Sequence, residues 1–469
     1  MSTQVSLSDD PIAAVATPFG EGAIGVIRTS GESCIELCAH VFSRPDAVLA
    51  AAGHTMVHGY LVDPQTGRSY DEVLLAVFRA PKSYTGQDSV EISCHGSPAG
   101  MQAVMGLLLQ YGFRAAEPGE FTLRAFLNGK LDLTQAEAVQ ELVTAKTRTA
   151  HSLALSRLSG GIYQRIDAVK QRLVRAMAAI SIQLDYPEDE IGPIPLPQGD
   201  IDFARDELQG LQTTYRSGRL YQEGVRIALA GRTNAGKSSL FNLLVREDRS
   251  IVSDQHGTTR DYIETMINIE GIPIRLFDTA GLRDTQESIE FEGIRRSGMI
   301  IESAELVLYL VDAVRGLEQE DLDRLGQMRD GGVPHLQVWN KIDARIGASG
   351  QSGDSGADGF PEIPAGAVTL SAQTGEGLAA LHAAVLEAVG QGEGISDGAV
   401  VVDSQRQHDL IQRALQALAQ VQLDIDQRDH LDVLALDLQE VLNALGEITG
   451  EVTSADVLDA MFSGFCVGK

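Results

Sequence analysis

The run Gly-Arg-Thr-Asn-Ala-Gly-Lys-Ser at residues 231–238 constrains the fold of this chain more than any other feature. It follows the apolar segment Val225–Ala230, and the segment 239–245 behind it has a helical pattern. Glycines let backbone N–H groups face an anion, and a helix N-terminus attracts one. Lys237 is expected to reach the β- and γ-phosphates of a nucleotide, and Ser238 to bind Mg²⁺. The sequence therefore predicts a phosphate-binding loop between a strand and a helix.

A second signal, Asp278-Thr279-Ala280-Gly281, comes directly after the apolar segment Ile272–Phe277. Asp278 can hold Mg²⁺ through a water molecule, and the N–H group of Gly281 can contact a γ-phosphate. Between the two signals lies Gly257-Thr258-Thr259-Arg260-Asp261, where a switch loop is expected. Thr259 is the predicted second Mg²⁺ ligand when a triphosphate is bound.

Two further signals concern the base. Asn340-Lys341-Ile342-Asp343 follows the apolar segment Leu336–Trp339, and Ser371-Ala372 follows Ala367–Leu370. The carboxylate of Asp343 can accept hydrogen bonds from N1–H and the 2-amino group of guanine. Adenine lacks this pair of donors, so a buried acceptor would stay unpaired with ATP. Four such segments in this order predict a guanine-nucleotide site.

Apolar segments in the middle of the chain alternate with helical patterns, which predicts a mainly parallel sheet covered by helices. The clearest segments are 225–230, 272–277, 305–311 and 336–339. Helical spacing of apolar residues also runs through 162–184 and returns at 411–425. Each group exposes an apolar face, and the simplest arrangement packs the two groups together with 225–395 inserted between them. Residues 10–125 have the pattern of a mixed unit of helices and strands.

The balance of charge limits what the surface can bind. The chain has 469 residues, a formal net charge of −28 and 43% hydrophobic residues, enough for two or three domains. An acidic surface repels a phosphate backbone, so nucleic acid must be bound locally or by a basic partner. No signal peptide and no apolar stretch long enough to span a bilayer is recognisable. We therefore expect a cytoplasmic protein without membrane contact.

Segments outside the nucleotide site carry a resemblance to a known family. They are Ala16-Thr-Pro-Phe-Gly-Glu-Gly22, Ser83-Tyr-Thr-Gly86, His95-Gly96, Arg124-Ala-Phe-Leu-Asn-Gly-Lys130 and Phe465-Cys-Val-Gly-Lys469. Together with the motifs at 231–239 and 257–261 they resemble the MnmE (TrmE) family of tRNA modification GTPases, over essentially the whole chain.

The resemblance implies the fold class and the domains. The expected fold is an α/β P-loop GTPase domain inserted into an α-helical domain, preceded by an α+β folate-binding-like N-terminal domain. The implied N-terminal domain, 1–127, binds tetrahydrofolate and forms dimers. The helical domain consists of 128–224 and 396–469, and the GTPase domain is 225–395.

Position 282 is Leu, whereas Ras-like enzymes place a water-orienting Gln there. The resemblance implies that K⁺ activates hydrolysis while two GTPase domains pair, and that Glu290 is catalytic through a bridging water. A cation beside the β- and γ-phosphates can replace an arginine finger. The implied K⁺ ligands are Asn234, Ser253, Gln255 and Thr258.

The implied GTP-binding residues are Asn234, Ala235, Gly236, Lys237, Ser238, Ser239, Ser253, Asp254, Gln255, His256, Gly257, Thr258, Thr259, Asp278, Thr279, Ala280, Gly281, Asn340, Lys341, Asp343, Ser371 and Ala372.

The resemblance also implies a folate site formed by Arg28, Glu91, Lys130 and Lys469. A carboxylate suits the donor edge of a pterin, and cations suit the folate carboxylates. By resemblance, 5,10-methylene-tetrahydrofolate supplies the carbon of an aminomethyl-type group at C5 of the wobble uridine (U34) of certain tRNAs. The family works as a homodimer with the flavoprotein MnmG, which brings FAD and uses NADH, in an expected heterotetramer. Cys466 is either a reactive thiol or a small apolar side chain in a docked tail.

Two other interpretations stay open at the level of sequence. The chain could be a regulatory GTPase in ribosome assembly that performs no modification, which the GTPase motifs alone do not exclude. It could also be a folate-dependent methyltransferase with an attached switch domain. The N-terminal motifs and the Cys-Val-Gly-Lys terminus speak against the first alternative, and wobble nucleosides from a deletion strain would separate all three.

Overall fold

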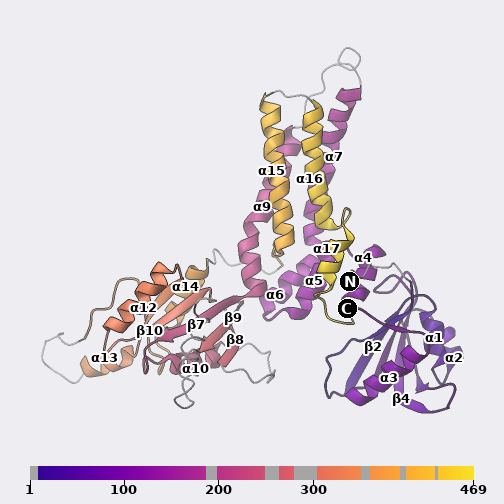
Figure 1. Ribbon diagram of the computed structural model, residues 1–469, viewed down its shortest axis with the longest axis horizontal. Helices are drawn as coiled ribbons and strands as arrows, with labels where there is room; N and C mark the ends of the chain where they lie inside the picture. Colours follow the sequence, from indigo (N-terminus) through magenta and orange to yellow (C-terminus); the bar gives the residue numbers. More distant parts are fainter. Residues whose placement is uncertain are drawn as a thin grey trace. The chain divides into compact units, whose positions relative to one another are not determined.

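A computed structural model describes residues 9–185, 198–248, 263–278, 301, 304–349, 360–390, 398–427 and 431–468. The chain divides into two compact units, and Figure 1 labels many of their elements. The first unit consists of residues 1–143, 157–209 and 409–469, and the second of residues 144–156 and 210–408.

The N-terminal part of the first unit is a six-stranded sheet with the strand order β3-β4-β5-β2-β1-β6. Its strands are β1 (Ile12–Val15), β2 (Ile24–Ser30), β3 (Thr55–Val62), β4 (Ser69–Phe78), β5 (Ser89–His95) and β6 (Arg114–Ala115). Neighbouring strands are antiparallel except β1 and β6. Helices α1 (Cys34–His40), α2 (Pro45–Leu49) and α3 (Pro98–Gln110) share one buried apolar cluster with the sheet. The mixed unit predicted for residues 10–125 is confirmed.

The rest of the first unit is helical. Its elements are α4 (Glu120–Leu127), α5 (Leu133–Thr144), α7 (Gly161–Asp185), α9 (Gln198–Glu223), α15 (Gln405–Gln427), α16 (Leu431–Thr449) and α17 (Ala455–Phe462). Helix α7 packs against α16. In the predicted apolar stripe of α7, Ile162, Ile166, Val169, Leu173 and Ile180 are buried, whereas Leu184 near its end is 47% exposed. Helix α9 belongs to the first unit up to residue 209 and to the second unit from residue 210.

The second unit is built on a six-stranded sheet with the order β12-β11-β10-β7-β9-β8. Its strands are β7 (Val225–Gly231), β8 (Ile263–Ile269), β9 (Ile272–Asp278), β10 (Leu306–Asp312), β11 (His335–Asn340) and β12 (Val368–Leu370). Its helices include α10 (Lys237–Glu247), α12 (Gln319–Asp330), α13 (Ile342–Ser349) and α14 (Leu378–Val389). All neighbouring strands are parallel except β8 and β9, which confirms the predicted mainly parallel sheet.

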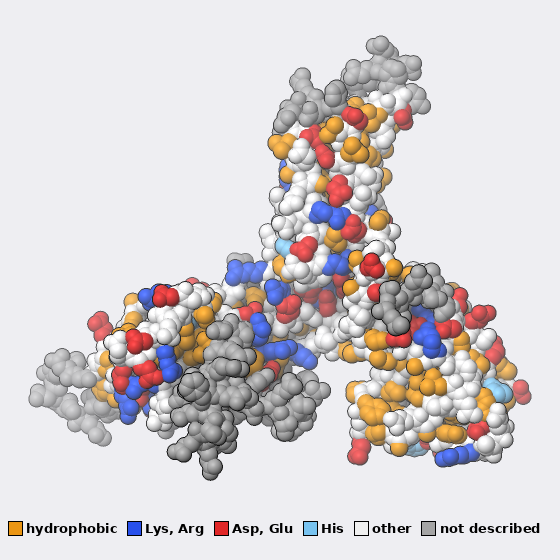
Figure 2. Space-filling model, viewed as in Figure 1, with side chains coloured by type: hydrophobic (Ala, Val, Ile, Leu, Met, Phe, Trp, Pro, Cys, Tyr) orange, Lys and Arg blue, Asp and Glu red, His pale blue; other side chains and the backbone are white. Residues whose placement is uncertain are grey.

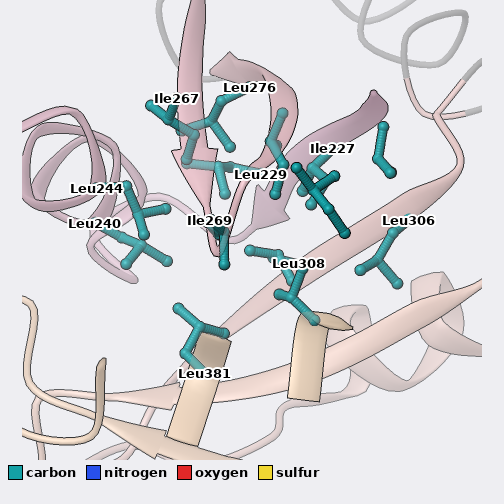
Figure 3. Close-up of a cluster of buried hydrophobic side chains, with 14 of the residues drawn as sticks. Ile227, Leu229, Leu240, Leu244, Ile267, Ile269, Leu276, Leu306, Leu308 and Leu381 are labelled. Atoms are coloured by element: carbon teal, nitrogen blue, oxygen red, sulfur yellow. The ribbon is translucent and has the colours of Figure 1, made fainter. Parts of the chain in front are cut away.

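This sheet is buried on both faces. Successive side chains of a strand point to opposite faces, and in β10 the residues Leu306, Leu308 and Leu310 enter one apolar cluster. Their neighbours Val307, Tyr309 and Val311 enter another. Figure 3 shows part of the first cluster, where leucines of α10 and α14 meet side chains from four strands. Burial on both faces explains why the strands are continuous apolar runs in the sequence.

A segment from the predicted helical domain completes this core. Helix α6 (Arg148–Leu158) places Leu153 in the first cluster, beside Tyr221 of α9 and Val401. The hydroxyl of Ser156 donates a hydrogen bond to the carbonyl oxygen of Gly398, at 3.0 Å. Residues 144–156, 210–224 and 396–408 therefore lie in the same unit as the predicted GTPase domain.

Charged side chains of both signs are mixed on the face of the described residues that Figure 2 shows. Figure 2 shows Asp and Glu side chains spread among Lys and Arg on the visible face of both units. Within the ranges that the structure describes, no helix combines the length and the apolar character that crossing a bilayer requires.

Candidate functional site

The predicted phosphate loop lies between β7 and α10, as the sequence indicated. Its backbone turns through left-handed conformations at Gly231 (φ 133°), Asn234 (φ 64°) and Gly236 (φ 100°). Asn tolerates such a conformation better than most residues, and glycine carries no Cβ to oppose it. A Cβ on Gly236 would lie 2.1 Å from Nδ2 of Asn340. The loop conformation and the close approach of Asn340 therefore both require glycine at this position.

Lys237 folds back over this loop. Its Nζ donates hydrogen bonds to the carbonyl oxygens of Gly231 and Arg232, both at 2.8 Å. The residue is 8% exposed, so the ammonium group is held at the centre of the loop. A buried cation surrounded by backbone groups at a helix N-terminus is suited to a phosphate.

Oxygen atoms suited to a divalent cation lie next to the loop. The hydroxyl of Ser238, in the first turn of α10, donates a hydrogen bond to Oδ2 of Asp278 at 3.2 Å. Asp278 is the last residue of β9 and is 3% exposed. Mg²⁺ prefers a few hard oxygen ligands of this kind, with water completing its shell.

Asn340 joins three of the predicted segments. Its Nδ2 donates to the carbonyl oxygen of Ala235 in the phosphate loop, at 3.0 Å. Its Oδ1 accepts from the backbone N–H of Ala372, at 2.9 Å. The side chain is 2% exposed, and both of its polar atoms are paired within the protein. Asn340 therefore fixes the segments predicted to bind the base against the phosphate loop.

The same segments border a pocket of about 540 Å³. Its lining residues are Gly236, Ser239, Asn242, Leu243, Arg246, Asn340, Lys341, Asp343, Ala344, Ala372 and Gln373. Asp343 lies in the first turn of α13, beside Lys341. Ser371 is fully buried and its hydroxyl accepts a hydrogen bond from the N–H of Thr374, at 3.1 Å. Ser371 therefore stabilises the turn that carries Ala372 rather than lining the pocket itself.

Several predicted residues lie outside the part of the chain that the structure describes. They are Ser253, Asp254, Gln255, His256, Gly257, Thr258, Thr259, Thr279, Ala280, Gly281, Leu282, Glu290 and Lys469. Of the predicted K⁺ ligands, the structure describes Asn234, which is exposed at the rim of the phosphate loop.

In the first unit, two of the predicted folate residues meet. Arg28 of β2 and Glu91 of β5 are paired across the sheet, with Arg28 Nη2 2.8 Å from Glu91 Oε1. The guanidinium carbon of Arg28 lies 5.4 Å from the ring centre of Tyr84 and 5.9 Å from that of Phe121. Arg28 Nη1 also donates to the carbonyl oxygen of Gly468, at 3.4 Å. The C-terminal segment therefore reaches the Arg28–Glu91 pair.

Lys130 lies against the loop that carries Tyr84. Its Nζ donates to the carbonyl oxygen of Pro81 at 3.0 Å, and its stem lies beside Gly86. Burial raises the pKa of Tyr84, while the hydrogen bond with Thr122 and the charge of Arg28 act in the opposite direction. The motif Ser83–Gly86 thus touches Lys130 at one side and Arg28 at the other.

The sequence did not identify every residue of these two sites. Asn242, Arg246 and Gln373 line the pocket beside the phosphate loop, and Tyr84 flanks Arg28, but the sequence assigned none of them to a site. Asp312 was also missed, although it ends β10 at the same edge of the sheet as Asp278 and Asn340. Polar residues at the carboxyl ends of parallel strands are a signal that could have found it. Cys466 is exposed, which does not fit the small apolar side chain of a docked tail.

Comparison with known proteins covers nearly the whole chain. A family model described as the MnmE helical domain matches residues 133–466, and one described as the GTP-binding protein TrmE N-terminus matches residues 11–130. A protein of Borrelia recurrentis called tRNA modification GTPase MnmE is 43% identical over 98% of this chain and 98% of its own. A protein of that name from Treponema denticola is 42% identical over 98% of both chains. Another from Carboxydothermus hydrogenoformans is 39% identical over 99% of this chain and 100% of its own.

Among solved structures, the Era protein of Aquifex aeolicus is similar with a TM-score of 0.27 and 25% identity, over 41% of this chain and 66% of that chain. Such a low score adds nothing to the assignment, which depends on the matches in sequence. Both family models, and several relatives that match over nearly their full length, point to the same family. They show that the chain belongs to the MnmE family.

Proposed function

We propose that the chain is a GTP hydrolase that acts in tRNA modification. The observation that carries the proposal is that one chain combines the nucleotide site with similarity to tRNA modification GTPases over 98% of its length. The site holds Lys237 at the phosphate loop, and Asn340 and Asp343 at a pocket of about 540 Å³. A carboxylate at this pocket favours guanine over adenine.

Hydrolysis is proposed to use Mg²⁺ and K⁺. The Mg²⁺ ligands would be Ser238 and Thr259, and the contact of Ser238 with Asp278 supports an oxygen-lined position there. For K⁺ we propose Asn234, Ser253, Gln255 and Thr258, and the exposed amide of Asn234 supports this set. A bound K⁺ would supply positive charge beside the phosphates in place of an arginine finger. Leu282 cannot orient water as a Gln would. Glu290 is proposed to orient the attacking water.

The first unit is proposed to bind a tetrahydrofolate derivative through Arg28, Glu91, Lys130 and Lys469. The paired charges of Arg28 and Glu91 offer both a donor and an acceptor, and the rings of Tyr84 and Phe121 lie close by. Such a set suits the polar edge and the flat face of a pterin. The 5,10-methylene form would supply one carbon, which becomes part of an aminomethyl-type group at C5 of the wobble uridine (U34).

A partner and a second copy of the chain complete the proposal. The flavoprotein MnmG would supply FAD, use NADH and form a heterotetramer with two copies of this chain. The open face of the N-terminal sheet supports a homodimer, because Met56, Leu74 and Tyr60 are 63%, 40% and 45% exposed on its strands. Exposed apolar patches of this kind mark protein interfaces. The cytoplasm is the proposed location.

The GTPase domain is proposed to be inserted into the helical domain. In the sequence, residues 210–408 lie between the segments 157–209 and 409–469 of the first unit. Helix α7 comes before this insertion and α16 after it, and the two pack against each other.

The most informative experiment is tRNA modification with the purified full chain. The mixture contains the flavoprotein, tRNA, GTP, Mg²⁺, K⁺ and methylene-tetrahydrofolate labelled in its one-carbon unit. We expect label at C5 of the wobble uridine, guanine-specific hydrolysis that is faster in K⁺ than in Na⁺, and loss of both activities in Lys237→Ala.

Each other result contradicts a defined part of the proposal. Equal hydrolysis of GTP and ATP would overturn the nucleotide assignment. GTP hydrolysis without labelled tRNA, together with intact wobble nucleosides and defective ribosomes in a deletion strain, would point to a regulatory GTPase. Label in a methyl group without any need for GTP would point to a methyltransferase.

A further inference from the structure

A charged pair joins Lys341, which belongs to the motif at 340–343 and lines the predicted base pocket, to Asp312, which belongs to no sequence motif. Nζ of Lys341 donates a hydrogen bond to Oδ2 of Asp312 at 2.7 Å. Lys341 lines the pocket beside Asn340 and Asp343. Asp312 ends β10 and lies in register with Asn340 at the end of β11. The pair therefore connects the end of a central strand to one wall of the pocket.

The backbone fixes Asp312 independently of Lys341. Its Oδ1 accepts a hydrogen bond from the N–H of Val314 at 2.9 Å. Its own carbonyl oxygen accepts from the N–H groups of Arg315 at 3.1 Å and Gly316 at 2.8 Å. The two carboxylate oxygens thus have different partners, one in the turn and one on Lys341. This leaves Oδ2 in a defined position for the ammonium group of Lys341.

Lys341 needs such a restraint. Its backbone is left-handed, with φ 69°, and its side chain is 37% exposed. A lysine side chain has a flexible four-carbon stem whose rotamers are lost only when something holds the ammonium group. The ion pair holds that group at Oδ2 of Asp312. The methylene groups can then form a stable apolar wall for a flat base.

The charges favour a persistent pair. The carboxylate of Asp312 is 15% exposed. Burial alone would raise its pKa, but the hydrogen bond from Lys341 and those from the turn outweigh burial and keep the pKa below its ordinary value. A lowered pKa means that the carboxylate stays charged at every pH above the ordinary range of aspartic acid.

We propose that Asp312 is a positioning residue for the guanine base, which acts by holding Lys341 as a wall of the base pocket. This inference rests on the proposed function, since it requires a nucleotide in that pocket. GDP binding by the unaltered chain tests the proposed function, and the comparison of variants below tests Asp312 separately.

The test is the affinity of the full chain for GDP and for a non-hydrolysable GTP analogue, measured by calorimetry. Asp312→Asn keeps the shape of the side chain and removes its charge. We expect about a tenfold loss of affinity, as for one partly exposed charge-assisted hydrogen bond. The loss should be the same for both nucleotides because the base is common to them. At saturating GTP, kcat should change less than about twofold, since the pair does not touch the phosphates.

Two further variants decide whether the effect passes through Lys341. Lys341→Met keeps most of the stem and removes the charge, so adding Asp312→Asn to it should cause no further loss of affinity. Asp330→Asn removes an exposed carboxylate at the end of α12 and should leave binding unchanged. Unchanged affinity in Asp312→Asn would overturn the inference. Asp312→Asn could also lower the affinity equally in the unaltered chain and in Lys341→Met. That result would overturn the inference too, because Asp312 would then act through the turn at 312–316 and not through Lys341.

Discussion

Replacing Gly236 by Ala tests the contact between the phosphate loop and the base-binding segment. Two effects add at this position. The left-handed backbone, with φ 100°, opposes any L-residue by about 1–2 kcal/mol. The new Cβ would also lie 2.1 Å from Nδ2 of Asn340, so the amide must move. It would lose its hydrogen bonds to Ala235 and Ala372, each contributing about 0.5–1.5 kcal/mol.

Gly332 provides the matched control. It lies in the same unit and is also left-handed, with φ 67°, but a Cβ there would meet nothing within 4 Å. Gly332→Ala should therefore carry only the backbone effect. The difference between the two variants isolates the displacement of Asn340, for which we expect about 1–3 kcal/mol. For a unit of this size, this corresponds to a midpoint of thermal unfolding lower by roughly 3–10 °C.

The assay is tryptophan fluorescence during thermal unfolding of the full chain. The chain has one tryptophan, Trp339, which is 1% exposed and directly precedes Asn340. Its emission therefore reports unfolding of the second unit. Gly236→Ala should also weaken GDP binding, whereas Gly332→Ala should not. Equal midpoints for the two variants would refute the reasoning, because the predicted collision with Asn340 would then have no consequence.

Three other predictions concern the first unit. Arg28→Met should weaken binding of a tetrahydrofolate derivative at least about tenfold in calorimetry and leave GTP hydrolysis unchanged; unchanged folate binding would contradict the assigned site. Leu74→Asp on the open sheet face should convert the proposed dimer to monomers in sedimentation, whereas Leu109→Asp on α3 should not, although both leucines are similarly exposed (40% and 43%). A hydrogen bond from Tyr111 and others nearby lower the pKa of Asp63 to about 2, so its contribution to stability is complete above about pH 4 and is lost as the pH falls towards 2. Acid unfolding of the first unit should therefore depend less on pH between 4 and 2 in Asp63→Asn, and an identical pH profile would refute this.

Much of the second unit could be predicted because its signals are local. Strands β7, β9, β10 and β11 are buried on both faces or nearly so, and each is a short apolar run in the sequence. The phosphate loop needs only one strand, one turn and one helix. Strand β8 was not predicted, because it lies at the edge of the sheet and alternates polar with apolar residues. Periodicity alone gives a weaker signal for such a strand.

Side chains that act through distant partners give weaker local signals, and for Asp312 the signal is only its place at the end of a predicted strand. Asp312 is one acidic residue among many until β10 and β11 align it with Asn340. Tyr84 lies in the motif Ser83–Gly86, but the contact of its ring with Arg28 is visible only in the structure. The pairing of β2 with β5 brings Arg28 opposite Glu91, although 63 residues separate them. Contacts of this length depend on the topology, which no spacing rule in the sequence encodes.

Helix α6 contributes Leu153 to the core of the second unit, and this contact has a practical consequence. A fragment cut at Val225 loses Leu153 and Tyr221, and one that ends at 395 also loses Val401. Such a fragment exposes apolar surface even if its catalytic groups are intact, so its failure to fold would say nothing about how the domains are connected. Residues 157–209 separate α6 from the rest of that core along the chain, so no continuous stretch contains the whole GTPase without part of the first unit. If another GTPase domain replaced residues 225–395, its surface would have to pack against the segments that carry Leu153, Tyr221 and Val401. The domain therefore cannot be exchanged simply by cutting the chain at these two borders.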